Sequence, residues 1–165
     1  MKKVIFIIIC LGFIIGENMY GQNKQYLELA QETLKMFRCS VNINNYKLYG
    51  LSSPEGLEKV TIGEAIEHYG VPLDALRKYD ESQDPKNIIM EMGYLTLPLT
   101  EEGGTIVESF VLLNQREGKY QSTGIGQDFF SKWFMEMKLR GIVPKESQLV
   151  RVPAMNIAFA TSEME

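Results

Sequence analysis

Three strand-like segments in the second half of the chain limit its possible folds most strongly. Their sequences are YLTLPL, TIVESFVLLNQ and KYQSTGIG, and the links between them, EEGG and REG, carry glycine. Short glycine-bearing links between such segments are typical of β-hairpins, in which consecutive strands run antiparallel. We therefore expect an antiparallel β-meander over residues 94–126, covered by the elements that precede and follow it.

Two amphipathic segments flank these strands. Residues 25–39 and residues 128–140 each repeat apolar side chains at the spacing of one helix face. Asp128 is suited to cap the second helix, and Gly141 to end it. A last strand pattern, LVRVPAMNIAFAT, is interrupted by Pro153. This order of elements predicts the α+β class, with both helices on one face of an antiparallel sheet.

The segment EAIEHYGVPL, residues 64–73, contains the only histidine of the chain, His68. Its residues alternate as a strand, with Glu67 on one face and His68 on the other. Pro72 cannot donate a ladder hydrogen bond, which predicts an edge strand or the end of one. We expect His68 on the polar, exposed side of this strand, and Asp74 as the cap of the turn that follows.

The N-terminus has the three parts of a secretory signal peptide. Lys2 and Lys3 precede an apolar or glycine run over residues 4–16, and Gly21 offers a small residue for cleavage. This run is shorter than the roughly 20 residues that span a bilayer. We expect residues 1–21 to be removed, leaving residues 22–165 as a single domain, periplasmic or secreted, with no stable membrane insertion.

Charge and cysteine content exclude several classes of protein. The 165-residue chain has a formal net charge of −4 and no basic cluster, which argues against a nucleic-acid partner. Cys39 is the only cysteine left after cleavage, so an intramolecular disulfide is not expected. The domain must therefore depend on its hydrophobic core.

His68 and Cys39 are the candidates for catalysis. A carboxylate beside His68 could form a general base, but on a strand Glu67 points away and Glu64 lies about 13 Å along the chain. A Cys39–His68 pair would require the fold to bring the two together. We instead expect Cys39 to be a small buried residue at the end of the first helix, and we predict no catalytic residue.

Two ligand-binding motifs are incomplete. A calcium-loop register can be drawn through residues 80–91, but Pro85 stands where that loop requires glycine. Its ligands would be Asp80, Ser82, Asp84 and Glu91. Gly124 and Gly126 precede a helix, as in phosphate-binding loops, but Phe129 stands where the third glycine belongs. We therefore predict a solvated loop and a strand-to-helix turn, with no metal and no cofactor.

Aromatic side chains of the second helix are the best candidates for a binding surface. A helix more often uses such residues for core packing, but they could also line a ligand pocket. Phe129 and Phe130 cannot both face the sheet, because neighbours on a helix are 100° apart. One of them is expected to face a groove or a partner. The candidate binding residues are Phe129, Phe130, Trp133 and Phe134.

Part of the chain resembles a family of small exported bacterial proteins with no assigned activity. The resemblance rests on the SPE turn, the TIGEAI and VPLDAL runs and the hairpin pattern that ends in GKYQSTGIG, and it covers roughly residues 48–126. It implies an exported α+β domain and assigns no catalytic residue.

These observations favour an exported, non-catalytic binding or interaction domain. Its most specific form is a peptidase inhibitor with a cystatin-like arrangement, a fold-level analogy based on element order alone. The partner would be another exported or envelope protein. Two alternatives stay open: a small-ligand or lipid carrier that uses the aromatic helix, and a hydrolase that uses Cys39 or His68.

Overall fold

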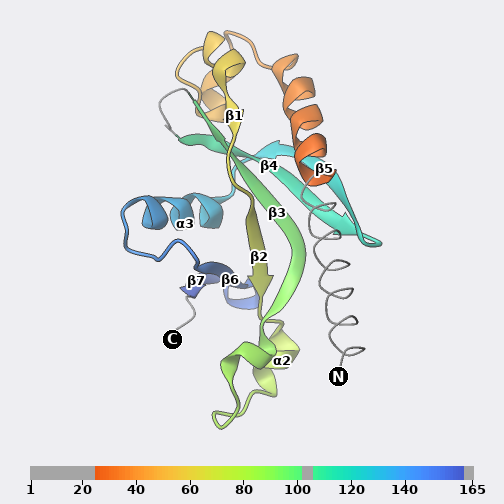
Figure 1. Cartoon of the computed structure of the whole chain (residues 1–165), viewed down its shortest axis with the longest axis vertical. Helices are drawn as coiled ribbons and strands as arrows, with labels where there is room; N and C mark the ends of the chain where they lie inside the picture. The colour runs from red at the N-terminus through yellow and green to blue at the C-terminus, as the bar shows by residue number, and fades with distance from the viewer. Residues whose placement is uncertain (1–24, 102–105, 162–165) are drawn as a thin grey trace, which may run out of the picture.

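The computed structural model describes residues 25–101 and 106–161, shown in colour in Figure 1. The predicted signal peptide, residues 1–21, lies outside this part of the chain. Within the two described ranges, no helix has the length and apolar character needed to cross a membrane.

One sheet organises the described residues. Its strands lie in the order β5-β4-β3-β2-β6-β7, and the short β1 also pairs with β3. The strands are β1 (Thr61–Ile62), β2 (Ile66–Gly70), β3 (Met90–Thr100), β4 (Ile106–Arg116), β5 (Lys119–Gly126), β6 (Gln148–Val152) and β7 (Ile157–Thr161).

The helices agree closely with those expected from the sequence. Residues 25–38 are helical, and α2 and α3 span Leu73–Arg77 and Phe129–Leu139. The Asp128 side chain accepts a hydrogen bond from the Ser131 amide at 2.9 Å, and Gly141 follows α3 with a φ of 66°. Both predicted ends of α3 are therefore confirmed. Short 3₁₀ turns occupy Tyr46–Tyr49, Glu55–Lys59, Pro85–Ile88 and Pro153–Met155.

The α+β class is confirmed, but the sheet is mixed rather than antiparallel throughout. Strands β3, β4 and β5 pair antiparallel in succession, and β2 pairs antiparallel with β3. On its other side β2 pairs in parallel with β6, with His68 opposite Leu149. The interruption at Pro153 separates two strands, β6 and β7, that form an antiparallel hairpin.

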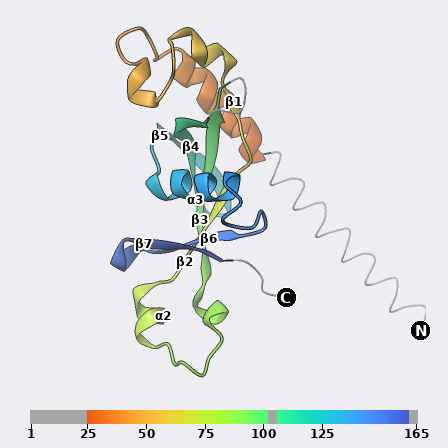
Figure 2. The same cartoon turned by 90° about the vertical axis from the view of Figure 1, so that its left-hand side faces the viewer.

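The two long helices cover opposite faces of the sheet, so the expectation that they share one face is wrong. On β3, Leu95, Leu97 and Leu99 join a core with the N-terminal helix. Phe110 of β4 and Phe134 of α3 belong to a second core on the other face. Figures 1 and 2 show α3 and the N-terminal helix with the sheet between them. The physical reason is that neighbouring residues of β4 are apolar on both faces, which requires cover on both sides.

The strand that carries His68 is an interior strand, so the edge-strand alternative is wrong, whereas Pro72 does lie at the end of the strand, as the other alternative expected. Strand β2 has β3 on one side and β6 on the other. Pro72 falls after the strand, next to Val71, whose amide makes the last bond to β6 by donating to the Arg151 carbonyl at 2.9 Å. Asp74 makes no cap and instead forms an exposed ion pair with Arg77 at 3.7 Å.

Substitution of a core leucine tests the burial of the β3 face that packs against the N-terminal helix. Leu97 is 0% exposed, so Leu97→Ala should lower the free energy of unfolding by about 2 to 5 kcal/mol. Leu48→Ala, at an exposed leucine, is the matched control and should change it by less than about 0.5 kcal/mol. Urea unfolding followed by circular dichroism measures both, and equal effects would contradict this assignment of the core.

Candidate functional site

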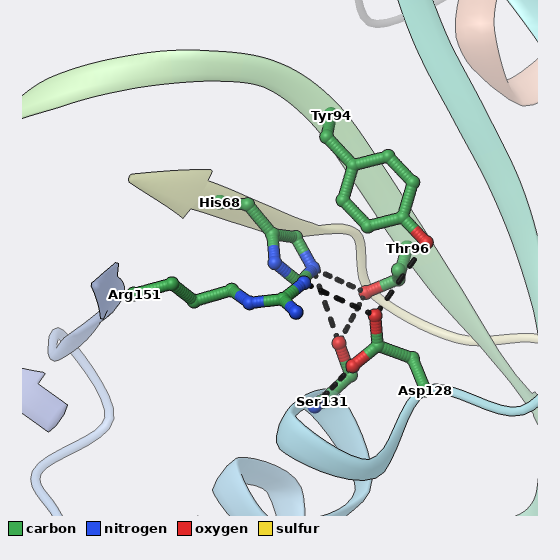
Figure 3. A network of polar contacts seen from close by, with 6 residues as sticks. All are labelled: His68, Tyr94, Thr96, Asp128, Ser131 and Arg151. Carbon is green, nitrogen blue, oxygen red and sulfur yellow. Dashed lines mark hydrogen bonds and ion pairs between the residues drawn. The ribbon is translucent and has the colours of Figure 1, made fainter. Parts of the chain in front are cut away.

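A buried polar cluster surrounds His68 on the face of the sheet that α3 covers. The His68 side chain is only 2% exposed, so the expectation of an exposed histidine is wrong. Burial follows from position, because β3 and β6 flank β2 and the first turn of α3 lies over the imidazole ring. Figure 3 shows the six side chains that meet there, from β2, β3, α3 with its cap, and β6.

Three polar atoms form a closed triangle in this cluster. The His68 Nε2 atom lies 3.0 Å from Thr96 Oγ1 and 3.1 Å from Ser131 Oγ, and the two hydroxyl oxygens are 2.8 Å apart. All three side chains are buried, so each contact replaces a hydrogen bond to water. The triangle joins β2, β3 and α3 at one point.

Asp128 and Arg151 lie beside the triangle. Arg151 Nη1 is 3.6 Å from Asp128 Oδ2, and the Arg151 guanidinium stacks over the Phe130 ring at 4.7 Å. The Tyr94 hydroxyl donates to the same Asp128 oxygen at 3.5 Å, and the Tyr94 ring meets the imidazole edge-on. Burial raises the pKa of Tyr94 to about 12, and the Asp128 charge adds to this shift. Tyr94 therefore stays a neutral hydrogen-bond donor.

The surroundings of the second imidazole nitrogen, Nδ1, indicate which tautomer of His68 is present. Neither His68 Nδ1 nor Arg151 Nε has a hydrogen-bond partner among the described residues. In Figure 3 the Nδ1 edge of the ring faces the Arg151 side chain. A lone pair facing a cation is favourable and an N–H is not, so this arrangement favours the tautomer with its proton on Nε2.

The pKa of His68 is consistent with a neutral ring. Burial is the largest cause and lowers this pKa from 6.5 to about 4; the Asp128 charge opposes the shift and the Arg151 charge adds to it. At neutral pH the ring therefore carries no charge. A base this weak is poorly matched to proton abstraction near pH 7.

The serine–histidine contact does not form a working catalytic triad. The fold brings Ser131, 63 residues away in sequence, to His68, which sequence reasoning had missed. Ser131 is 0% exposed, and the favoured tautomer cannot accept its proton. A triad also needs a carboxylate on the far nitrogen of the histidine. Asp128, the carboxylate nearest in the cluster, is engaged instead by Ser131 N–H, Tyr94 and Arg151.

The other catalytic candidates lie outside this cluster. Glu67 is exposed and accepts a hydrogen bond from the Tyr69 hydroxyl at 2.9 Å. Cys39 is also exposed, which corrects the expectation of a buried thiol; its sulfur lies 3.7 Å from the Lys35 carbonyl. It follows the end of the N-terminal helix, where its side chain points to solvent. The ring contacts of His68 come from Tyr94, Thr96 and Ser131 rather than from either of these residues.

The calcium-loop register has local partners instead of a shared centre. Asp80 accepts hydrogen bonds from the amide and the hydroxyl of Ser82, and Asp84 accepts one from the Lys86 amide and caps a 3₁₀ turn. Within the described part of the chain, no cluster of three or more histidine, cysteine or acidic side chains is placed to hold a metal ion.

The four aromatic candidates divide between core and surface. Phe134 is buried in the core beneath α3, and Phe130 and Trp133 pack against that core. Phe129 is 76% exposed, and its ring packs edge-on against Phe130 with centroids 5.6 Å apart. The expected divergence of Phe129 and Phe130 is therefore confirmed, with Phe129 as the outward-facing ring.

Comparisons of the chain with protein-family models, curated proteins and solved structures give no significant match in any of the three. The resemblance to exported bacterial proteins therefore stays a prediction, and the function must be argued from the residues of this chain.

Acid should destabilise the fold through His68. Because burial lowers the pKa of His68, the folded state favours the neutral ring. The contribution of this ring to the free energy of unfolding is complete above pH 6.5 and is lost as the pH falls toward 4. From about pH 7 to about pH 5 the wild type should lose about 2 kcal/mol more than His68→Gln, which cannot titrate at this position. Urea unfolding at each pH measures the difference, and parallel pH profiles would contradict this role.

Proposed function

We propose that this protein is an exported, non-catalytic binding domain, which contacts another exported or envelope protein through the surface around Phe129. One observation carries this proposal: a large aromatic ring is 76% exposed at the start of α3, while the serine–histidine pair beneath it is sealed from solvent. The predicted signal peptide supports export, and the buried pair argues against hydrolysis.

The surroundings of Phe129 suit recognition of a protein. Its ring rests on Phe130, and Phe130 lies under the Arg151 guanidinium, which in turn pairs with Asp128. These ring contacts and the ion pair hold the Phe129 side chain in place before a partner binds, so the side chain loses little conformational freedom on binding. Aromatic and arginine side chains dominate the binding energy of many interfaces.

Peptidase inhibition is the most specific form of this proposal. Its support is the packing of one long helix against β3, β4 and β5, as a cystatin-like arrangement would have it; the analogy itself came from element order alone. The parallel β2–β6 pair and the cover by α3 on the second face are additions to that arrangement. Titration of exported cysteine peptidases with the domain, followed by residual activity, tests this form.

The hydrolase alternative has one observation in its favour, the 3.1 Å contact between Ser131 and His68. A fluorophosphonate probe that labels activated serines should leave the folded protein unmodified, because Ser131 is buried and lacks a base. Labelling that Ser131→Ala abolishes would contradict the non-catalytic proposal.

Loss of the exposed ring should weaken binding without loss of stability. The domain from residue 22 is crosslinked to its partner in an envelope extract of the host, and the identified partner is then purified for titration. Phe129→Ala should weaken that complex about tenfold or more, as expected for an aromatic hot spot. Leu139→Ala, at an exposed leucine near the other end of α3, is the matched control and should bind as the wild type does.

Two results would count against the Phe129 surface. One is a partner that binds Phe129→Ala and the wild type equally well, which would place the interface elsewhere. The other is a co-purifying small molecule with no protein partner, which would favour the carrier alternative.

A further inference from the structure

Strand β7 forms an unprotected edge of the sheet. Within residues 25–101 and 106–161 its only ladder partner is β6, so one row of its backbone amides and carbonyls faces away from the sheet. Its sequence, IAFAT, contains no charge, no proline and no glycine. Natural proteins usually block such edges with charges, prolines or bulges, because an open edge pairs readily with another strand.

The opposite edge, β5, carries such protection. The β4–β5 ladder shifts register next to Gly124, whose φ is 118°, so the edge is bulged rather than regular. A charged residue, Lys119, begins the strand. Within the described residues the two edges of the sheet therefore differ: β5 has a bulge and a charged residue, and β7 has neither.

The apolar face of the β6–β7 hairpin continues to the open edge. Val150 and Val152 are buried, and their cross-strand neighbours on β7 are Phe159 and Ile157. Phe159 is still 45% exposed, and Ile157 is exposed as well. The charged side chain of this hairpin, Arg151, lies on the other face beside His68. The face that ends at β7 is thus uncharged, and it is apolar except at the polar pair Gln148 and Thr161.

We propose that β7 pairs antiparallel with β7 of a second copy of this chain, about a two-fold axis at Phe159. In this register Phe159 faces its own copy, and Ile157 faces Thr161 of the other chain. In this register odd-numbered residues pair with odd-numbered residues and even-numbered with even-numbered ones. The amides and carbonyls that point away from β6 in one copy therefore meet the corresponding amides and carbonyls of the other copy. Pairing joins two sheets into one and buries the exposed parts of Ile157 and Phe159.

A second copy fits this edge better than an unrelated peptide because the strand is self-complementary. A two-fold axis places each side chain beside its own copy or a symmetry-related neighbour, and like charges there would repel. IAFAT contains none. The pairing is independent of the surface proposed for the exported partner, because Phe129 lies on α3 and Phe159 on the other face of β6–β7.

Opposite charges at position 159 test the register directly. Sedimentation equilibrium of the domain from residue 22 should show a concentration-dependent dimer. Phe159→Lys and Phe159→Glu should each be monomeric at concentrations where the wild type is dimeric, because like charges meet at the axis. An equimolar mixture of the two variants should regain the dimer. Leu139→Lys, at an exposed residue of α3, should dimerise as the wild type does.

Each result decides for or against this pairing. A wild type that stays monomeric up to its solubility limit overturns it, and so does a dimer that persists in Phe159→Lys. A mixture that stays monomeric, with both variants folded by circular dichroism, overturns the axis at Phe159. Restored dimer in the mixture supports it and also excludes misfolding as the cause of the separate losses. Failure here leaves binding through Phe129 unaffected, because that test uses a different residue.

Discussion

The two-sided burial of β3 is the constraint on which the rest of the structure depends. Its leucines fill one core, and its alternate residues, Tyr94 and Thr96, face α3 on the other side. A hydroxyl that is buried in this way needs partners inside the protein. Thr96 finds them in His68 and Ser131. The polar cluster is thus a structural consequence of covering a central strand on both faces. The same burial lowers the pKa of His68, so the histidine in this cluster is neutral at neutral pH.

Local patterns in the sequence predicted most of the elements but not how they are layered. Helical spacing, the Asp128 cap and the REG link depend on residues close together in the chain, and the structure agrees with each. The EEGG link falls mostly on residues 102–105, outside the described part of the chain. The placement of the helices on two faces depends on β4, where Phe110 to Leu113 is one continuous apolar run. Such a run is a signal of burial on both faces that could have been used.

The burial of His68 could not be predicted from its own segment. Its strand alternates in the same way whether the histidine faces solvent or a helix, and the difference comes from β6 and α3, both far along the chain. The carboxylate nearest in the cluster, Asp128, was recognised only as a helix cap. The aromatic helix was easier to interpret, because the 100° step between neighbours requires Phe129 and Phe130 to diverge.

The parallel pairing of β2 with β6 also determines the order in which the sheet can be completed. The paired residues are roughly 80 positions apart, so closing this loop costs much more chain entropy than closing the hairpins of β3, β4 and β5. The hairpins can therefore form first, while the face of β2 that carries His68 is still exposed to solvent. Because Arg151 of β6 is part of the cluster around the imidazole, that cluster is complete only when the β6–β7 hairpin has joined the sheet beside β2.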